Sequence, residues 1–157
     1  ILSVPPIHQN NFDVLFRRKE KIVCVTAENS IFLKGITAPT LEELAECPLC
    51  LSTGCHLMMS KIFAEKSIRP QVLSICTTRT TALRWAEDDC GVSIVPMEPK
   101  EKLPEGLIAK AITGVDTDLY KTVVRVKGRP LSVVAKKFLQ FYSDVRDSER
   151  MIKIKDL

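Results

Sequence analysis

The stretch PLCLSTGCH, residues 48–56, decides the fold, because it joins the end of one regular element to the start of the next. Its first four residues form a short apolar run, which predicts a buried strand. The small and polar side chains of residues 52–54 (Ser-Thr-Gly) then interrupt that run. Beyond them apolar residues recur at helical spacing and predict a helix; these are Met58, Met59, Ile62 and Phe63.

The same order of elements repeats immediately afterwards. The sequence predicts a strand over residues 72–76, a polar turn at Thr77 and Thr78, a helix over residues 80–90 and a strand over residues 92–95. Three strands joined by helical crossovers imply a parallel sheet, and therefore an α/β fold. Parallel sheets bind ligands at the carboxyl ends of their strands, where this chain has two hydroxyl-rich turns.

We therefore expect a ligand site at these two turns. A turn of small residues lets a ligand approach the backbone, and a helix N-terminus directs unpaired N–H groups at it. The guanidinium of Arg79 could hold a carboxylate in bidentate fashion, although a solvent-facing role in the first helical turn explains it equally well. A small anionic ligand, such as a carboxylate, fits this set. The expected ligand-binding residues of the two turns are Ser52, Thr53, Gly54, Cys55, Thr77, Thr78 and Arg79.

The rest of the chain supplies further strands and two helices. We expect strands over residues 12–16 and 21–26 joined by a basic segment, a short helix with a capping box at Thr40 and Glu43, strands over 107–112 and 119–126, and a terminal helix capped by Ser132. Strands on both sides of the central block must pair outside it. This order predicts two lobes, with residues 20–111 in one and residues 1–19 and 112–157 in the other.

Composition and charge are those of an ordinary globular protein. Of the 157 residues, 45% are hydrophobic and 27% charged, and the net charge is +4. With acidic residues interleaved throughout, the case for a nucleic-acid surface is weak. No apolar run approaches the roughly 18 residues of a membrane span, and nothing resembles a signal peptide. The chain opens on Ile1 instead of Met, so we expect a fragment of a longer protein.

Six cysteines allow several interpretations. Three of them, Cys24, Cys50 and Cys76, fall in predicted strands, where a thiol behaves as a small apolar residue, so we expect a reducing, cytoplasmic setting. A metal site using Cys47, Cys50, Cys55 and His56 is disfavoured because a strand residue cannot easily turn toward Cys47. No metal or cofactor is expected. Cys55 stands at a helix N-terminus, where the dipole lowers a thiol pKa, so redox sensing stays an alternative.

Four segments together resemble a known family. They are TLEELAECPLCL (40–51), SIRPQVLSICTT (67–78), ALRWAEDDCGVSIVP (82–96) and VVRVKGRPLSVVAKKFLQFY (123–142). In order and spacing they are similar to the regulatory domain of LysR-type transcriptional regulators, and the likeness covers most of the chain. One departure is Asp88-Asp89, where the family usually has a small residue and glycine. An aspartate tolerates a left-handed turn less readily than glycine does.

The resemblance implies a periplasmic-binding-protein-like (type II) two-lobe domain. One lobe, residues 20–111, would be complete with a central, mostly parallel sheet, and residues 1–19 and 112–157 would be the remnant of the other. A small effector would bind between the lobes, with Ser3, Val4, Pro5 and Ile112 on the opposite wall, and no catalysis is implied. DNA binding would belong to a winged helix-turn-helix outside this chain, in a homodimer or homotetramer with no membrane contact. The alternatives are a redox-sensing domain that uses Cys55 and a solute-binding protein.

Overall fold

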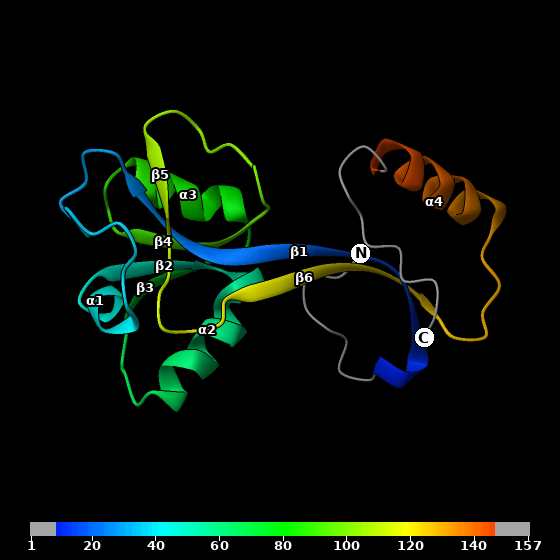
Figure 1. The fold of residues 1–157 in the computed structure, drawn as a ribbon, viewed down its shortest axis with the longest axis horizontal. Coiled ribbons are helices and arrows are strands. Elements are labelled where there is room, and N and C mark those ends of the chain that lie inside the picture. The colour runs from blue at the N-terminus through cyan, green and yellow to red at the C-terminus, as the bar shows by residue number, and fades with distance from the viewer. Residues whose placement is uncertain (1–8, 147–157) are drawn as a thin grey trace. The chain divides into compact units, whose positions relative to one another are not determined.

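The structure, a computed structural model, describes residues 9–146. Contacts divide the chain into two compact units. Unit 1 comprises Ile1–Lys19 and Tyr120–Leu157, and unit 2 comprises Glu20–Leu119. Figure 1 shows the elements of both units coloured along the chain. Whether these units correspond to the two lobes implied by the resemblance stays a prediction.

The strands form one mixed sheet in the order β3-β2-β4-β1-β5, and β6 pairs with β1. Strand β2 is parallel to both β3 and β4, which confirms the predicted βαβαβ block, whereas β1 runs antiparallel to β4 and β5. The strands are β1 (Phe12–Ala27), β2 (Pro48–Ser52), β3 (Gln71–Cys76), β4 (Val92–Met97), β5 (Leu107–Ala111) and β6 (Asp118–Val126).

The helices begin and end close to where the sequence predicts. They are α1 (Leu41–Ala45), α2 (Thr53–Glu65), α3 (Arg79–Glu87) and α4 (Val133–Arg146). The structure adds a 3-10 turn, η1 (Gln9–Asn11), for which no prediction was made. The predicted capping box is present: the Glu43 N–H donates to Thr40 Oγ1 over 3.2 Å, and the Thr40 N–H donates to Glu43 Oε2 over 2.8 Å. Ser132 Oγ accepts from the Ala135 N–H over 3.2 Å and caps α4.

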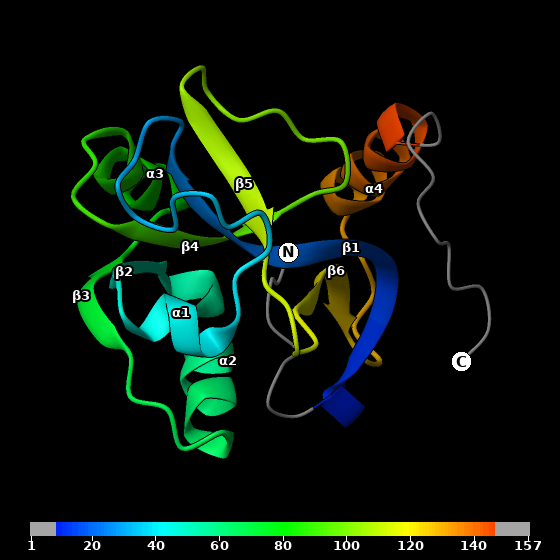
Figure 2. The same ribbon diagram turned by 60° about the vertical axis from the view of Figure 1, so that its left-hand side comes forward.

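The core of unit 2 lies on both faces of its sheet. In Figures 1 and 2, α1 and α2 cover one side of β2 and β4, and α3 covers the other. Successive strand residues point to opposite faces, so Leu49 and Leu51 pack with Phe63 on the first side, whereas Val95 packs with Ala82 on the second. The apolar residues of the helices and strands therefore form two packed layers, one on each face of the sheet.

Unit 1 is built on a ribbon of β1 and β6. The Lys127 N–H donates to the Asn11 carbonyl over 2.8 Å, and Arg125 Nε donates to Asp13 Oδ2 over 2.8 Å. The guanidinium of Arg17 lies 3.4 Å from the centroid of the Tyr120 ring, a cation–π contact. Strand β1 is unbroken from Phe12 to Ala27, so the predicted basic joint between two strands is wrong. Paired β strands keep the basic residues 17–19 extended.

Helices α2 and α3 end in the same motif. After α3, the Asp89 N–H donates to the Ala86 carbonyl over 3.2 Å and the Cys90 N–H to the Trp85 carbonyl over 3.0 Å, the pattern of a Schellman motif. Asp89 takes the left-handed position, with a φ of 49°. This conformation is expected at a position where the family usually has glycine. Ser67 has the same role after α2, with φ of 58°.

Candidate functional site

The structure brings the two predicted turns together. Strands β2 and β3 are paired in parallel with Ser52 opposite Cys76, so their carboxyl ends are neighbours at one edge of the sheet. Helix α2 begins at Thr53 and α3 begins at Arg79. Both helices therefore begin at the same end of the sheet, after neighbouring strands, with α2 on one face of the sheet and α3 on the other.

Thr53 has a different role from the expected one. Its Oγ1 donates a hydrogen bond to the Cys76 carbonyl over 2.9 Å and ties the ends of β2 and β3 together. The expectation that this hydroxyl is reserved for a ligand is therefore corrected. Replacing Thr53 by Val would remove a link between strands as well as a polar group at the site.

Ser52 and Cys55 have buried side chains. Their Oγ and Sγ atoms lie 3.3 Å apart, and Cys55 Sγ also donates to the Ile94 carbonyl over 3.1 Å. Burial raises the pKa of the Cys55 thiol, and the hydrogen bonds from Ser52 only partly oppose this. The expected lowering by the helix dipole is thus outweighed by desolvation. Neither side chain is available to line an open site.

The N-terminus of α2 has no side-chain cap. Ser52 stands at the capping position but makes no capping hydrogen bond, since its hydroxyl contacts Cys55. A Cβ built on Gly54 would meet nothing within 4 Å, so the backbone there is open to approach. Helix α3 differs, because Thr78 Oγ1 accepts from the Thr81 N–H over 3.1 Å. The first turn of α2 therefore keeps the N–H groups that an anion could accept from.

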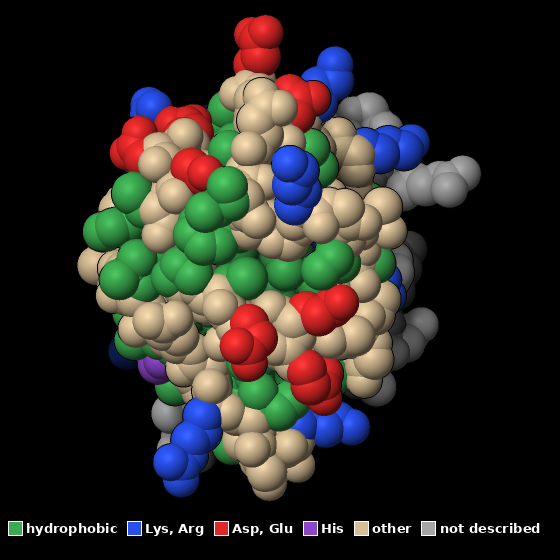
Figure 3. All heavy atoms as spheres, turned by 90° about the vertical axis from the view of Figure 1, so that its left-hand side faces the viewer, with side chains coloured by type: hydrophobic (Ala, Val, Ile, Leu, Met, Phe, Trp, Pro, Cys, Tyr) green, Lys and Arg blue, Asp and Glu red, His purple; other side chains and the backbone are tan. Residues whose placement is uncertain are grey.

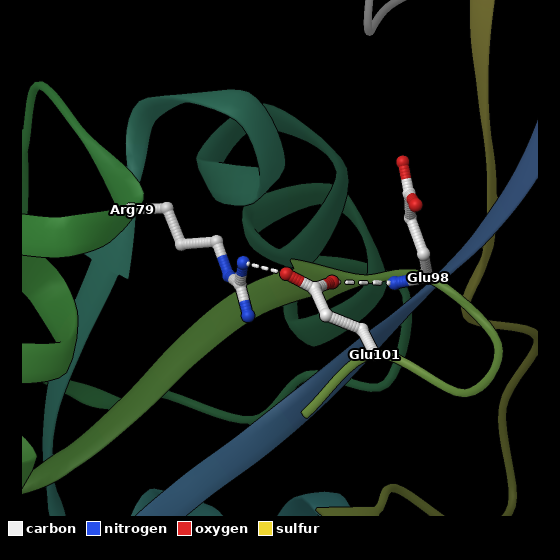
Figure 4. A network of polar contacts seen from close by, with 3 residues as sticks. All are labelled: Arg79, Glu98 and Glu101. Carbon is white, nitrogen blue, oxygen red and sulfur yellow. Dashed lines mark hydrogen bonds and ion pairs between the residues drawn. The ribbon is translucent and has the colours of Figure 1, made fainter. Parts of the chain in front are cut away.

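Arg79 is paired with a carboxylate that the sequence did not point to. Its Nη1 donates to Glu101 Oε1, and Glu101 Oε2 accepts from the Glu98 N–H over 3.0 Å, as Figure 4 shows. The Arg79 and Glu101 side chains are 29% and 28% exposed. The Nε of Arg79 is buried and has no hydrogen-bond partner among the described residues. Arg79 therefore binds a carboxylate of the same chain, and the expectation that it binds a ligand carboxylate stays a prediction.

The opposite wall receives no support from the described residues. Ile112 packs in the core of unit 2 next to Leu119, so its expected place on the wall of the site is corrected. Ser3, Val4 and Pro5 lie outside the described residues. Glu101 was missed because its partner is 22 residues away and no spacing rule links them.

A hollow lies elsewhere in unit 2, away from the ends of β2 and β3. It has a volume of about 660 Å³ and lies between the segment after β1 and strand β5. Its polar lining includes Glu28, Lys34 and Lys110, but Lys110 Nζ already donates to the Leu33 carbonyl over 2.7 Å. Nothing in the sequence predicts a site there.

Strand β3 forms the outer edge of the sheet and exposes apolar side chains. Val72, Leu73 and Ile75 are 42%, 50% and 50% exposed. Figure 3 views the side of the molecule on which β3 lies and shows hydrophobic side chains gathered there. A sheet edge with this composition is a surface for pairing with another chain.

No group of three or more His, Cys, Asp or Glu residues within the range 9–146 is placed to hold a metal ion. Among the helices of the same range, none combines the length and the apolar character needed to cross a membrane.

Comparison with solved structures shows which fold the chain shares. The effector binding domain of QuiR in complex with shikimate is 19% identical with a TM-score of 0.73, over 93% of this chain and 70% of that one. The regulatory domain of Synechocystis PCC6803 CcmR in complex with 2-PG is 15% identical with a TM-score of 0.69, over 88% and 68%. The C-terminal domain of a probable LysR family regulator from Rhodococcus sp. RHA1 is 23% identical with a TM-score of 0.64, over 84% and 66%. The fold is thus that of the effector-binding domains of transcription regulators.

The family itself is shown by the sequence. Residues 1–147 match the LysR substrate binding domain, and the chain belongs to that family. This confirms the resemblance and the two-lobe, periplasmic-binding-protein-like fold class. The chain spans only about half of full-length regulators such as CbnR (46%) and BenM (52%). Comparison with curated proteins gives no match.

Proposed function

We propose that this chain binds a small carboxylate at the carboxyl ends of β2 and β3, as the effector-sensing domain of a LysR-type regulator. The observation that carries the proposal is the uncapped N-terminus of α2, which lies beside the Arg79 turn on the neighbouring strand. Shikimate, the compound bound by the QuiR domain, is a carboxylate and supports this chemistry.

The binding groups of the proposed site come mainly from the backbone. N–H groups in the first turn of α2, at Gly54 and Cys55, donate to the anion, and the exposed Thr77 hydroxyl lies at the end of the adjacent strand. A helix terminus contributes about 0.3–1 kcal/mol toward an anion, and each charge-assisted hydrogen bond about 1.5–3 kcal/mol. Because the site offers only a few such bonds, we expect a dissociation constant in the high micromolar range, which corresponds to a binding free energy of roughly −5 kcal/mol.

The test places a competing charge at the first turn of α2. Gly54→Glu adds a carboxylate in open space at a helix N-terminus, where acidic residues are tolerated well, so the fold is retained. Gly54→Gln is the neutral control of nearly the same size. Calorimetry with shikimate, succinate and acetate should show at least tenfold weaker binding to Gly54→Glu than to Gly54→Gln. Equal binding by the wild type and Gly54→Glu would place the site elsewhere.

In the whole regulator, the effector would change how a separate winged helix-turn-helix is presented to DNA. Full-length CbnR has been solved with its target DNA, and this chain corresponds to 48% of that structure. A cytoplasmic location and assembly as a homodimer or homotetramer belong to the same proposal. This chain alone should give no sequence-dependent shift of DNA in a gel assay at physiological salt, and a specific shift would contradict the assignment of DNA binding to another domain.

A further inference from the structure

The carboxylate that Arg79 holds is fixed by its own turn. The Glu101 N–H donates to the Glu98 carbonyl over 3.2 Å, and the Glu98 N–H donates to Glu101 Oε2 over 3.0 Å. Between them Lys100 has a φ of 68°, a left-handed conformation that costs energy for a residue other than glycine. The turn from Glu98 to Glu101 is therefore a constrained structure that presents one carboxylate oxygen to Arg79, as Figure 4 shows.

Arg79 stands at the edge where the proposed effector binds. It is the first residue of α3 and comes three residues after Cys76, the last residue of β3, which pairs with Ser52 directly before α2. Its charge is already balanced by Glu101, yet its buried Nε N–H has no acceptor among residues 9–146. A guanidinium offers five N–H donors, so Glu101 does not exhaust its capacity.

We infer that Glu101 is a specificity-determining residue: a built-in carboxylate that competes with the effector for Arg79. This inference rests on the proposed function of the site. Because Glu101 is attached to the same chain, it acts at a high effective concentration, and an acid with a single carboxylate gains little by exchanging one ion pair for another. Simple monocarboxylates therefore bind weakly.

A dianion is the class of effector that overcomes this competition. One anionic group binds the first turn of α2, and the second reaches Arg79, which follows the neighbouring strand β3. The first group keeps the ligand in place while the second displaces Glu101. Displacement also removes the contact that holds the turn from Glu98 to Glu101, so Lys100 can leave its left-handed conformation.

The experiment compares two substitutions that remove the same charge from the same segment. Glu101→Gln frees Arg79, whereas Glu105→Gln changes an exposed residue four positions away and is the control. Calorimetry with acetate and succinate should show acetate binding about tenfold tighter (about 1.4 kcal/mol) to Glu101→Gln than to the wild type or Glu105→Gln. Succinate should be preferred over acetate by a smaller factor in Glu101→Gln than in the wild type. Thermal unfolding without ligand verifies that each variant folds.

Each other outcome overturns the inference in a recognisable way. If the wild type, Glu101→Gln and Glu105→Gln bind acetate equally while Gly54→Glu abolishes binding, the site stands and Glu101 is not a competitor. If the double variant Arg79→Gln/Glu101→Gln still binds acetate more tightly than the wild type, the effect of Glu101→Gln does not act through Arg79. If no protein binds either acid at tens of millimolar, the inference and the proposed function fail together.

Discussion

Asp89 has a backbone conformation that favours glycine over aspartate. It occupies the left-handed position that ends α3, and its Oδ1 is buried without a hydrogen-bond partner among the described residues. Asp89→Gly should raise the free energy of unfolding by about 0.5–1 kcal/mol, because relief of the left-handed strain outweighs the added chain entropy of glycine. Chemical denaturation measures this difference.

The neighbouring Asp88 provides the control. Its φ is −81°, so glycine there brings entropy without relief of strain, and Asp88→Gly should lower stability. If both substitutions stabilise the protein to the same extent, removal of negative charge is the cause instead of backbone conformation.

Cys24 should make stability depend on alkaline pH. Burial raises the pKa of its thiol to about 12 from an ordinary value of 9.0, although nearby Lys110 lowers it. The folded state therefore holds a proton that the unfolded state releases, so this stabilisation is complete below about pH 9 and is lost as pH rises toward 12. Between about pH 8 and pH 10.5 the loss amounts to about 2 kcal/mol.

Cys24→Ala separates the contribution of the Cys24 thiol to the pH dependence of stability from the contributions of other groups. The variant should be less stable than the wild type at pH 8, because it leaves a cavity in the core. That difference should narrow by about 2 kcal/mol at about pH 10.5. A difference that stays constant with pH, in parallel denaturation curves, would mean that the buried thiol is not the linked group.

At the scale of an element, β3 is one of the two strands at the ends of the strand order, so one of its edges is unpaired among the described residues. Its exposed Val72, Leu73 and Ile75 provide an apolar surface that suits pairing with a second copy of the chain. We expect a weak dimer at high protein concentration, and Leu73→Lys should shift it toward monomer because a charge at a strand edge opposes pairing. Ile31→Lys, at an exposed apolar residue outside the sheet, is the control. Light scattering that finds a monomer at every concentration, or equal effects of both substitutions, would contradict this role of β3.

The elements were largely predictable, and the contacts between them were not. Apolar spacing was enough for α2 and for the parallel strands, because each pattern lies within a few turns or residues. The continuity of β1 was missed since basic residues at its middle look like a break, although pairing with other strands keeps them extended. Within the candidate site, the turns were found, but the roles of Thr53 and Glu101 depend on partners 23 and 22 residues away.

At the scale of the whole molecule, the two units differ in how much core they possess. Among residues 9–146, both clusters of buried apolar side chains lie within residues 20–119. In unit 1, by contrast, α4 leaves Val133, Val134 and Phe141 more than two-thirds exposed. Hydrogen exchange should therefore show amides of α4 exchanging much faster than those of β2, because a helix with little packing opens locally. Equal protection in both elements would contradict this difference in stability.

The unbroken course of β1 has an evolutionary consequence. Residues 12–19 of this strand belong to one unit and residues 20–27 to the other. Inserting or deleting a single residue would turn every later side chain of the strand to the opposite face, which would place Ile22 and Cys24 outside the core that they now fill. Related genes should therefore tolerate substitutions along this segment far better than changes in its length.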